Sequence, residues 1–350
     1  MVKRVAFAVP GNLDTPTGGY AYDRRMIAEL ERLGWRVELI DIGEGFPWPS
    51  ETVRAAARTR LLKVQSGWPI VIDGLALGVL PELVSELAGN HPLLALVHHP
   101  LALEWGLSLT QADKLRRSER AALAFAQAVV VTSAATARIV ASDYGVPAHC
   151  IAVARPGNDP VPQARGSQGN APQLLSVGAV IPRKGFAVLI RALAAVGDLP
   201  WRLTIVGDLT RDPAAASALQ ADIVREALTG RITIAGAVSS EDLASLYDSA
   251  DLFVLASYFE GYGMAYAEAL AHGLPVIGTT AGAIPETIPD GAAMLVTAGD
   301  TASLAQALRC ILTDSSMRMR LSKAARAAAR TLPTWPQSGA IFAGALEKLA

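Results

Sequence analysis

The chain has 350 residues, a length that suits two domains of ordinary size rather than one. Its 31 lysines and arginines almost balance its 32 aspartates and glutamates, so the overall charge gives no reason to expect a nucleic-acid partner. Hydrophobic residues make up 51% and charged residues 18%, a composition that excludes an intrinsically disordered chain.

The cysteines and the apolar runs indicate in which cellular compartment the protein is expected. Cys150 and Cys310 are far apart and lack His neighbours at metal-ligand spacing, so we expect neither a disulfide framework nor a zinc site. The first apolar run stops at Pro10, which indicates a strand rather than a signal peptide. The most apolar stretch, residues 121–137, is interrupted by polar residues and is shorter than the ~20 residues that span a bilayer. We therefore expect a soluble, cytoplasmic protein.

The first half of the chain opens with a strand, a loop and a helix. Residues 4–9 form an apolar strand run, residues 10–19 are rich in Gly and Pro, and residues 20–33 repeat apolar side chains at helical spacing. Gly34 ends that helix, and residues 35–40 form the next strand. Further apolar runs suit central parallel strands at residues 69–72, 93–97 and 128–132.

The second half repeats this order. Residues 173–177 form a strand, 178–185 a loop, 186–196 a helix and 201–206 a strand. Units of this kind predict right-handed crossovers and parallel sheets, so we expect an α/β protein with two Rossmann-like, doubly wound domains. Further strands of the second sheet are expected at residues 231–235, 252–256 and 275–278.

A stretch rich in Pro, Gly, Asn and Gln separates the halves and lacks periodicity. We predict an N-terminal domain over residues 1–160, a linker over 161–172 and a C-terminal domain over 173–330. Ligands of doubly wound sheets bind beyond the carboxyl ends of the strands, so two facing sheets predict one cleft between domains.

Residues 257–277, SYFEGYGMAYAEALAHGLPVI, carry the most informative chemistry. A strand leads through a glycine-containing turn into a helix that begins near Gly263. Carboxylates repel a diphosphate, so Glu260 and Glu268 suit sugar hydroxyls, since an ionised carboxylate accepts two hydrogen bonds from a vicinal diol. The helix N-terminus and the neighbouring backbone amides offer a seat for phosphate at Gly261, Tyr262, Gly263 and Met264.

The Glu-x7-Glu spacing within EGYG…EALAxGLPVI resembles the signature of family-4 retaining glycosyltransferases, which have the two-domain GT-B fold. The resemblance implies that Glu260 lies by the transferred sugar and that Glu268 holds the ribose diol. It is clear over roughly residues 173–346 and looser before that. It thus implies a C-terminal domain that binds a nucleotide-sugar donor and an N-terminal domain that binds the acceptor. Two solvated helix carboxylates are the alternative interpretation.

Two other segments are similar to donor-binding parts of that family. Residues 176–186, SVGAVIPRKGF, resemble the loop that brings an Arg and a Lys to the donor diphosphate. Arg183 offers a planar fork and Lys184 a point charge, and both would neutralise the leaving group; two solvated loop cations are the alternative. Gly18 and Gly19 resemble the glycine pair that lets backbone amides approach the donor phosphate, with a plain turn as the alternative.

His98 and His99 follow the predicted strand at residues 93–97, where polar side chains point into the predicted cleft. In the family a His at this place often contacts the donor sugar, so the resemblance assigns His98 to the reacting region. The family often has a small or acidic residue where His99 stands, which leaves the choice between the two open. A structural histidine is the alternative.

Three features complete the resemblance. Residues 235–247 resemble the base-binding turn and the helix after it, so backbone groups near Val238 would bind the base, with Ser239 or Ser240 as the helix N-cap. Residues 282–286 resemble a Gly-Gly-x-x-Glu loop, but Ala281 replaces its first Gly, and Glu286 is equally a helix-start carboxylate. Residues 331–350 are similar to a closing helix that crosses back to the N-terminal domain.

No Asp-x-Asp follows a strand, so we expect a donor site that needs no metal and no cofactor, in which Arg183, Lys184, glycine amides and a helix dipole stabilise the diphosphate. The resemblance implies front-face transfer with retention of configuration. The acceptor stays open among a saccharide, a lipid-linked saccharide and a small molecule.

Two other functions stay open on the same architecture. One is a catalytically silent nucleotide-sugar-binding scaffold, and the other is a nucleotide-sugar 2-epimerase. No Gly-x-Gly-x-x-Gly follows either first strand, which argues against a nicotinamide or flavin enzyme. Basic clusters at residues 54–63 and 114–120 could touch anionic lipid headgroups at a peripheral membrane surface, although a solvated helix face is the simpler interpretation.

Overall fold

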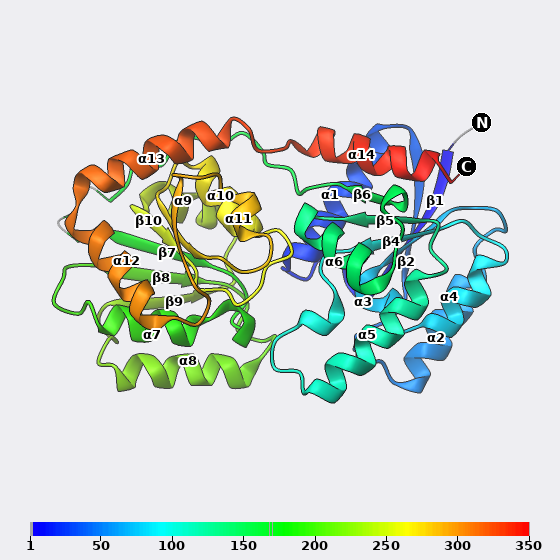
Figure 1. Ribbon diagram of the computed structural model, residues 1–350, viewed down its shortest axis with the longest axis horizontal. Coiled ribbons are helices and arrows are strands. Elements are labelled where there is room, and N and C mark those ends of the chain that lie inside the picture. The colour runs from blue at the N-terminus through cyan, green and yellow to red at the C-terminus, as the bar shows by residue number, and fades with distance from the viewer. Residues whose placement is uncertain (1–2, 168, 170, 350) are drawn as a thin grey trace. The chain divides into compact units, whose positions relative to one another are not determined.

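The computed structural model describes residues 3–167, 169 and 171–349 and divides into two compact units (Figure 1). Unit 1 comprises Met1–Gly157 and Pro333–Ala350, and unit 2 comprises Asn158–Leu332. Each unit is built on a six-stranded sheet whose strands are all parallel. The α/β fold class with two doubly wound sheets is therefore confirmed.

Unit 1 has the strand order β2-β1-β3-β4-β5-β6. Because side chains alternate along a strand, Ala6 and Ala8 of β1 face one core while Phe7 faces the other side, where it stacks on Phe342. The strands are β1 (Lys3–Val9), β2 (Trp35–Asp41), β3 (Ile70–Asp73), β4 (Leu93–Val97), β5 (Ala128–Val131) and β6 (Ile151–Val153).

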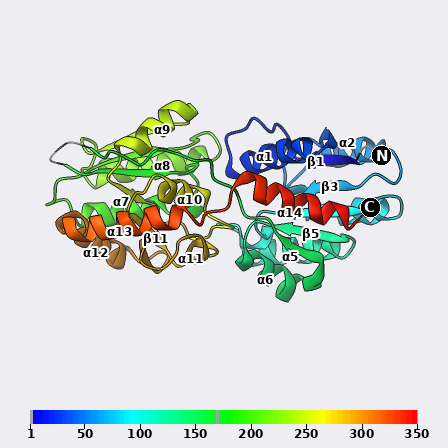
Figure 2. The ribbon, with the colours of Figure 1, turned by 90° about the horizontal axis from the view of Figure 1, so that it is seen from above.

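Helices cover both faces of this sheet. Helices α1 (Gly18–Arg32) and α14 (Trp335–Glu347) pack against each other on the Phe7 side, as Figure 2 shows. The other core takes apolar side chains from α2 (Glu51–Leu61), α3 (Gly74–Leu77), α4 (Pro81–Ala88), α5 (Leu109–Leu123) and α6 (Ala134–Tyr144). Short 3-10 turns lie at Leu101–Leu103 and Ala148–Cys150.

Unit 2 has the strand order β12-β11-β10-β7-β8-β9 around one apolar core. Its strands are β7 (Gln173–Val177), β8 (Arg202–Val206), β9 (Ile232–Gly236), β10 (Leu252–Val254), β11 (Val276–Thr279) and β12 (Ala293–Val296). Its helices are α7 (Phe186–Ala194), α8 (Pro213–Arg225), α9 (Ser240–Ser249), α10 (Met264–Ala271), α11 (Ile284–Thr287), α12 (Thr301–Thr313) and α13 (Ser315–Ala329), with a 3-10 turn at Pro182–Lys184.

The boundary between the two units differs from the domain boundary expected from the sequence. The boundary falls between Gly157 and Asn158, and the described part of the predicted linker 161–172 belongs to unit 2. The Ala164 amide donates to the His272 carbonyl at 2.9 Å, and Arg165 pairs with Asp248 at the end of α9. These are backbone and ionic contacts, which leave no hydrophobic periodicity in the sequence. Residues 168 and 170 of that segment lie outside the described residues.

Strands β6 and β12 had no counterpart in the sequence-based prediction. Both lie at sheet edges and are short, and their side chains are only half-buried. An edge strand has only one neighbouring strand, and its half-buried side chains do not need the continuous apolar run that marks a central parallel strand. The central strands did carry such runs and lie within a residue or two of the expected positions.

Glu119 of α5 is a buried carboxylic acid beneath the segment that follows β4. Its Oε2 accepts a hydrogen bond from the Leu101 amide at 3.0 Å, and its side chain is almost fully covered. Burial raises the pKa of Glu119 to about 8, although the Leu101 hydrogen bond opposes that rise. The folded protein therefore keeps this proton at pH values where the unfolded chain has lost it.

It follows that Glu119 lowers the free energy of unfolding as the pH rises from about 4.5 to about 8, because only the unfolded state releases the proton. We expect Glu119→Gln to abolish this decline and to be about 1–3 kcal/mol more stable than wild type above pH 8. Urea unfolding at acid and alkaline pH measures this. Glu82→Gln, which changes an exposed residue of α4, is the control. An unchanged pH slope in Glu119→Gln would contradict the prediction.

Candidate functional site

The strand order of unit 2 reverses between β7 and β10, which lie side by side. At such a switch point the segments that follow the two strands lead to opposite sides of the sheet and leave a crevice between them. The segment after β7 carries Arg183 and Lys184, and the segment after β10 carries Glu260. Residues 76 positions apart or more in the sequence thus meet at one point of the sheet.

Glu260 is the centre of this cluster. Its Oε1 accepts hydrogen bonds from Lys184 Nζ at 2.7 Å and from Ser257 Oγ at 2.6 Å, and its Oε2 lies 3.4 Å from Arg183 Nη1. The same Arg183 nitrogen donates to the Phe259 carbonyl at 2.7 Å. Each cationic side chain is only 14% exposed, so solvent screens these ion pairs weakly.

The cations control the charge of Glu260. Burial by itself would raise its pKa, but the charges of Lys184 and Arg183 and the hydrogen bonds from Lys184 and Ser257 hold it at about 2. Glu260 is therefore ionised at neutral pH. It can accept hydrogen bonds from a ligand, and it has no proton to donate.

Two glycines allow these segments to meet. Gly185 has a φ of +67°, and a Cβ there would lie 2.0 Å from the carbonyl oxygen of Ala256. Gly282 has a φ of +58°, and a Cβ there would lie 2.3 Å from the Glu260 carbonyl oxygen. The amide after it, on Ala283, donates to that same carbonyl at 2.9 Å. Both positions need glycine for conformation and for close approach.

Ala281 causes no conflict in this loop. Among the described residues, Ala227 is the one non-glycine with a positive φ, so position 281 has no need of glycine. The left-handed residue of the loop is Gly282. Glu286 lies in the first turn of α11, which leaves open whether it is a site residue or a helix-start carboxylate.

The predicted phosphate seat lies where the turn after β10 enters α10. Gly263 is the N-cap of α10 with a φ of +94°, and Met264 is the first helical residue. Tyr262 and Gly263 are buried, whereas Gly261 and Met264 are partly exposed. The turn of residues 261–263 therefore connects Glu260 to the start of the helix.

Glu268 lies one turn further along α10 and is held by Tyr247, which the sequence did not mark. The Tyr247 hydroxyl from α9 donates to Glu268 Oε2 at 3.0 Å, and its ring stacks on His272 with centroids 4.8 Å apart. Burial raises the pKa of Glu268, while the Tyr247 hydrogen bond and the charge of Lys184 oppose the rise. Lys184 thus influences both carboxylates.

Val238 lies in the turn between β9 and α9 and takes no part in the hydrogen bonds around Glu260 and Glu268 described above. It is half-buried, and Ser239 rather than Ser240 is the N-cap of α9, with its hydroxyl accepting from the Asp242 amide at 3.1 Å. The helix start expected from the sequence is therefore present.

The predicted residues of unit 1 lie at the other switch point, where β1 neighbours β3. Gly18 and Gly19 form the first turn of α1 instead of preceding it, with Thr17 as N-cap. A Cβ on Gly19 would lie 3.5 Å from His98 Cδ2, an ordinary contact. Gly19 therefore adjoins His98, which follows β4.

His98 lies between two buried carboxylates that the sequence analysis missed. Its Nε2 is 3.1 Å from Asp23 Oδ1 and 3.4 Å from Asp73 Oδ2, whereas His99 contacts Glu104 at 3.3 Å. Asp73 is the last residue of β3, so the signal that selected His98, a polar residue at the carboxyl end of an apolar strand, was present for Asp73 too. Asp23 lies within α1 and carried no such signal.

Asp23, Asp73 and His98 are also the one group in the described part of the chain whose ligand atoms, within 4.8 Å of one another, could surround a metal ion. The distances to Nε2 are those of hydrogen bonds, and the other Asp73 oxygen accepts from the Leu75 amide at 2.7 Å. We therefore interpret the group as an ion cluster in which His98 is the cation.

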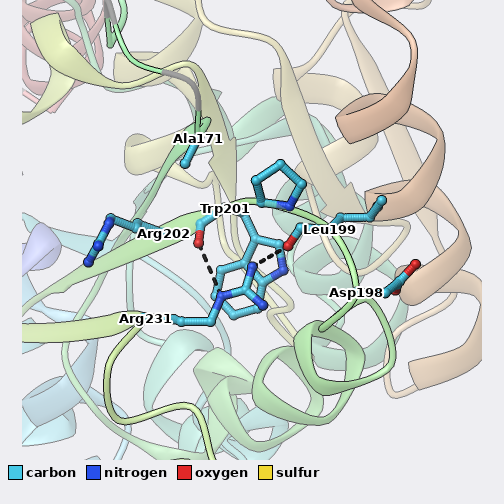
Figure 3. Close-up of a pocket in the computed structure, with 7 residues that line it drawn as sticks. Ala171, Asp198, Leu199, Trp201, Arg202 and Arg231 are labelled. Atoms are coloured by element: carbon cyan, nitrogen blue, oxygen red, sulfur yellow. Dashed lines mark hydrogen bonds between the residues drawn. The ribbon is translucent and has the colours of Figure 1, made fainter.

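A cavity of about 400 Å³ at the amino end of β8 is a different feature (Figure 3). The Arg231 guanidinium lies 3.8 Å from the centre of the Trp201 ring and donates to the carbonyls of Gly197, Leu199 and Trp201. Asp198 at its rim pairs with Arg309. These charged groups serve the structure, at the opposite end of the strands from the switch point.

Residues 171–314 match the family model described as glycosyl transferases group 1. This part of the chain belongs to that family. The group 1 segment contains Arg183, Lys184, Glu260 and Glu268, and so includes the whole cluster at the switch point of unit 2. None of the helices in the described residues is long and apolar enough to cross a membrane.

Curated relatives extend the similarity beyond this segment. The chain is 27% identical over 331 residues to the MMP alpha-(1->4)-mannosyltransferase of Mycolicibacterium hassiacum, covering 87% of this chain and 77% of that protein. It is 30% identical over 261 residues to the D-inositol 3-phosphate glycosyltransferase of Nocardia farcinica, covering 67% of this chain and 57% of that protein. The chain thus spans less than two thirds of the latter.

Solved structures share the whole fold. Sucrose-phosphate synthase from Thermosynechococcus elongatus superposes with a TM-score of 0.84 at 20% identity, covering 99% of both chains. Anabaena HepE in complex with UDP-glucose superposes with a TM-score of 0.79 at 21% identity, also covering 99% of both. The group 1 match and the relatives indicate a glycosyltransferase, and the solved structures share its GT-B fold.

The cluster predicts a measurable coupling between Lys184 and Glu260. We expect Lys184→Met to lower the free energy of unfolding by about 1–3 kcal/mol at neutral pH, because it leaves the buried Glu260 charge with less compensation. Wild-type stability supplied by Glu260 is present above about pH 4.5 and is lost as the pH falls toward 2, and Lys184→Met should lose less over that range.

The double variant Lys184→Met/Glu260→Gln is the control, since it removes both charges. Urea unfolding of wild type, Lys184→Met, Glu260→Gln and the double variant forms a double-mutant cycle. Additive effects of the two substitutions would contradict the ion pair.

Proposed function

We propose that the protein is a retaining glycosyltransferase that needs no metal and moves a sugar from a nucleotide diphosphate sugar to a hydroxyl of a separate acceptor. The observation that carries the proposal is the convergence of Arg183, Lys184 and Glu260 at the switch point of unit 2. Two cations suit a diphosphate, and an ionised carboxylate beside them suits the hydroxyls of its sugar.

The comparisons support this class of donor. Anabaena HepE, which shares the fold, binds UDP-glucose in its solved complex, and the names of the two curated relatives describe glycosyl transfer. The acceptor is a saccharide, a lipid-linked saccharide or a small molecule that offers a hydroxyl group.

Donor binding would exchange partners within the cluster. In the structure, Glu260 forms an ion pair with Lys184 at 2.7 Å and a longer one with Arg183 at 3.4 Å. Phosphate oxygens would compete for these cations, and Glu260 would then accept hydrogen bonds from sugar hydroxyls. Because both side chains are already held near the position of the diphosphate, little reorganisation is needed as charge develops.

In the reaction, the bond between sugar C1 and the phosphate oxygen breaks, and the electron pair leaves with the phosphate. Arg183 and Lys184 stabilise the charge that accumulates there. The acceptor hydroxyl approaches C1 from the same face and passes its proton to the departing phosphate oxygen, so configuration is retained. Glu260, which stays ionised, stabilises the positive charge on the sugar ring electrostatically and takes no part as an acid.

Glu268 would hold the ribose of the donor. A carboxylate oriented by Tyr247 has its second oxygen available for a hydroxyl pair. Tyr247 therefore acts as a positioning residue for nucleotide binding, since it contacts Glu268 and the α10 backbone.

The first test is a thermal-shift titration with UDP, GDP, ADP and their common hexose conjugates in EDTA. We expect one base class to stabilise wild type, and Glu268→Ala and Lys184→Ala to lose the shift because each removes a donor contact. Lys323→Ala, which changes an exposed lysine of α13, should respond like wild type. No stabilisation of wild type by any nucleotide, or wild-type responses from both site variants, would refute the donor site.

Turnover separates the remaining functions. A transferase consumes the donor faster once an acceptor is added, and NMR of the product reports its anomeric configuration. Epimerisation of the donor without an acceptor would favour a 2-epimerase, and binding without any turnover would favour a scaffold.

Tyr247→Phe tests the positioning of Glu268. It removes one hydroxyl and leaves the ring stack on His272 in place. We expect the KM for the nucleotide sugar to rise by about threefold to tenfold with little change in kcat, because one hydrogen bond to a charged group contributes on the order of 1 kcal/mol to binding. Steady-state kinetics measure this. A fall in kcat at unchanged KM would contradict the assigned role.

A further inference from the structure

The ion cluster of Asp23, Asp73 and His98 lies at the switch point of unit 1, the place where a doubly wound sheet offers its ligand crevice. Three separate segments supply it: α1 after β1, the end of β3, and the residue after β4. Asp23 is fully buried, Asp73 is nearly so, and the His98 side chain is 20% exposed. His98 is thus the member of the cluster that reaches the surface.

The contacts determine where His98 carries its first proton. Nε2 faces a carboxylate oxygen of Asp23 and one of Asp73. A bare Nε2 would point a lone pair at two negatively charged acceptors, which is repulsive, so Nε2 carries a hydrogen. Any proton exchanged with a ligand or solvent is therefore at Nδ1, for which the described residues provide no hydrogen-bond partner.

The surroundings keep that second proton in place. Burial lowers the pKa of His98, but the charges and hydrogen bonds of Asp23 and Asp73 outweigh it and raise the pKa to about 10. The other group against the ring is Tyr22, whose edge meets it with centroids 5.5 Å apart and whose hydroxyl is engaged by the Ala154 carbonyl. Asp23 Oδ2 has no partner among the described residues, and burial raises the pKa of Asp23 to about 7, although the charge and the hydrogen bond of His98 oppose that rise.

We propose that Asp23 and Asp73 are positioning residues that keep His98 as an imidazolium, with Nε2–H directed to the two carboxylates and Nδ1–H left to donate a hydrogen bond to a hydroxyl oxygen of the sugar substrate. The substrate part rests on the proposed function. Two buried carboxyl groups around one imidazolium leave no surplus of positive charge for a phosphate, so the cluster suits a neutral hydroxyl.

The proposal defines what His98 does in the reaction. An imidazolium held by two carboxylates donates a charge-assisted hydrogen bond and does not act as a general base near neutral pH. Removing either carboxylate would return His98 toward its ordinary pKa of 6.5, and Nδ1 would lose its hydrogen as the pH rises through that value.

Asp73→Asn is the sharpest test variant, because an asparagine can still cap α3. Its side-chain oxygen can accept from the Leu75 amide, while the negative charge that favours the imidazolium is removed. Asp23 still accepts from Nε2–H, so the proton that His98 loses in this variant is the one on Nδ1. Asp23→Asn removes the other charge. Glu119→Gln, which neutralises a buried carboxyl elsewhere in unit 1, is the matched control.

The first readout is the titration of His98 by nitrogen and carbon NMR of the full chain without ligand, with His98→Gln to assign the signals. We expect imidazolium shifts through about pH 9 in wild type and Glu119→Gln, and a pKa that falls to about 7 in Asp73→Asn and Asp23→Asn. Neutral imidazole at about pH 8 in wild type, or equal titration in the Asp variants, would overturn the proposal. So would Zn²⁺ or Mn²⁺ that binds stoichiometrically and displaces the proton.

The second readout is the pH profile of kcat/KM with the nucleotide sugar identified by thermal shift. We expect Asp73→Asn to lose on the order of tenfold to a hundredfold at pH 8 and to approach wild type near pH 6. A merely structural role would lower activity equally at both pH values, and that result would overturn the assignment. Because the NMR titration needs no ligand, failure of the proposed function stays distinguishable from failure of the cluster.

Discussion

The interaction on which the candidate site depends is the burial of one carboxylate, Glu260, against two cations from another part of the chain. An unpaired charge in this position would be costly, and the contact between the segments after β7 and β10 compensates it. Gly185 and Gly282 permit the approach, since a side chain at either would collide with backbone. The electrostatics that assemble the site are the same electrostatics that would bind a diphosphate.

The two units arrange charge at their switch points in opposite ways. Unit 2 places one carboxylate between two cations, and unit 1 places one imidazole between two carboxylates. Both clusters lie beyond the carboxyl ends of parallel strands, where backbone groups and helix starts leave room for polar side chains. Paired cations suit phosphate, whereas a cluster without surplus positive charge suits neutral hydroxyls.

The buried polar groups of the two clusters differ in their partners. Asp23 has one oxygen without a partner among the described residues, whereas Lys184 and Arg183 both contact the Glu260 carboxylate. Any ligand that binds only the folded state would also stabilise the fold. Arg231 in the cavity lined by Trp201 differs from these residues, because it donates hydrogen bonds to three backbone carbonyls and has a structural role.

The sequence by itself determined the architecture and most of the candidate chemistry. Continuous apolar runs marked the central strands, and a family resemblance selected Arg183, Lys184, Glu260, Glu268 and His98. The sequence did not predict the edge strands β6 and β12 or the boundary after Gly157. Short half-buried strands and backbone hydrogen bonds leave no periodic pattern in a sequence. Only the tertiary structure brought Asp23 and Asp73 to His98 and Tyr247 to Glu268. These contacts join segments distant in the chain, and a pairing across a sheet depends on strand order, which no local pattern encodes.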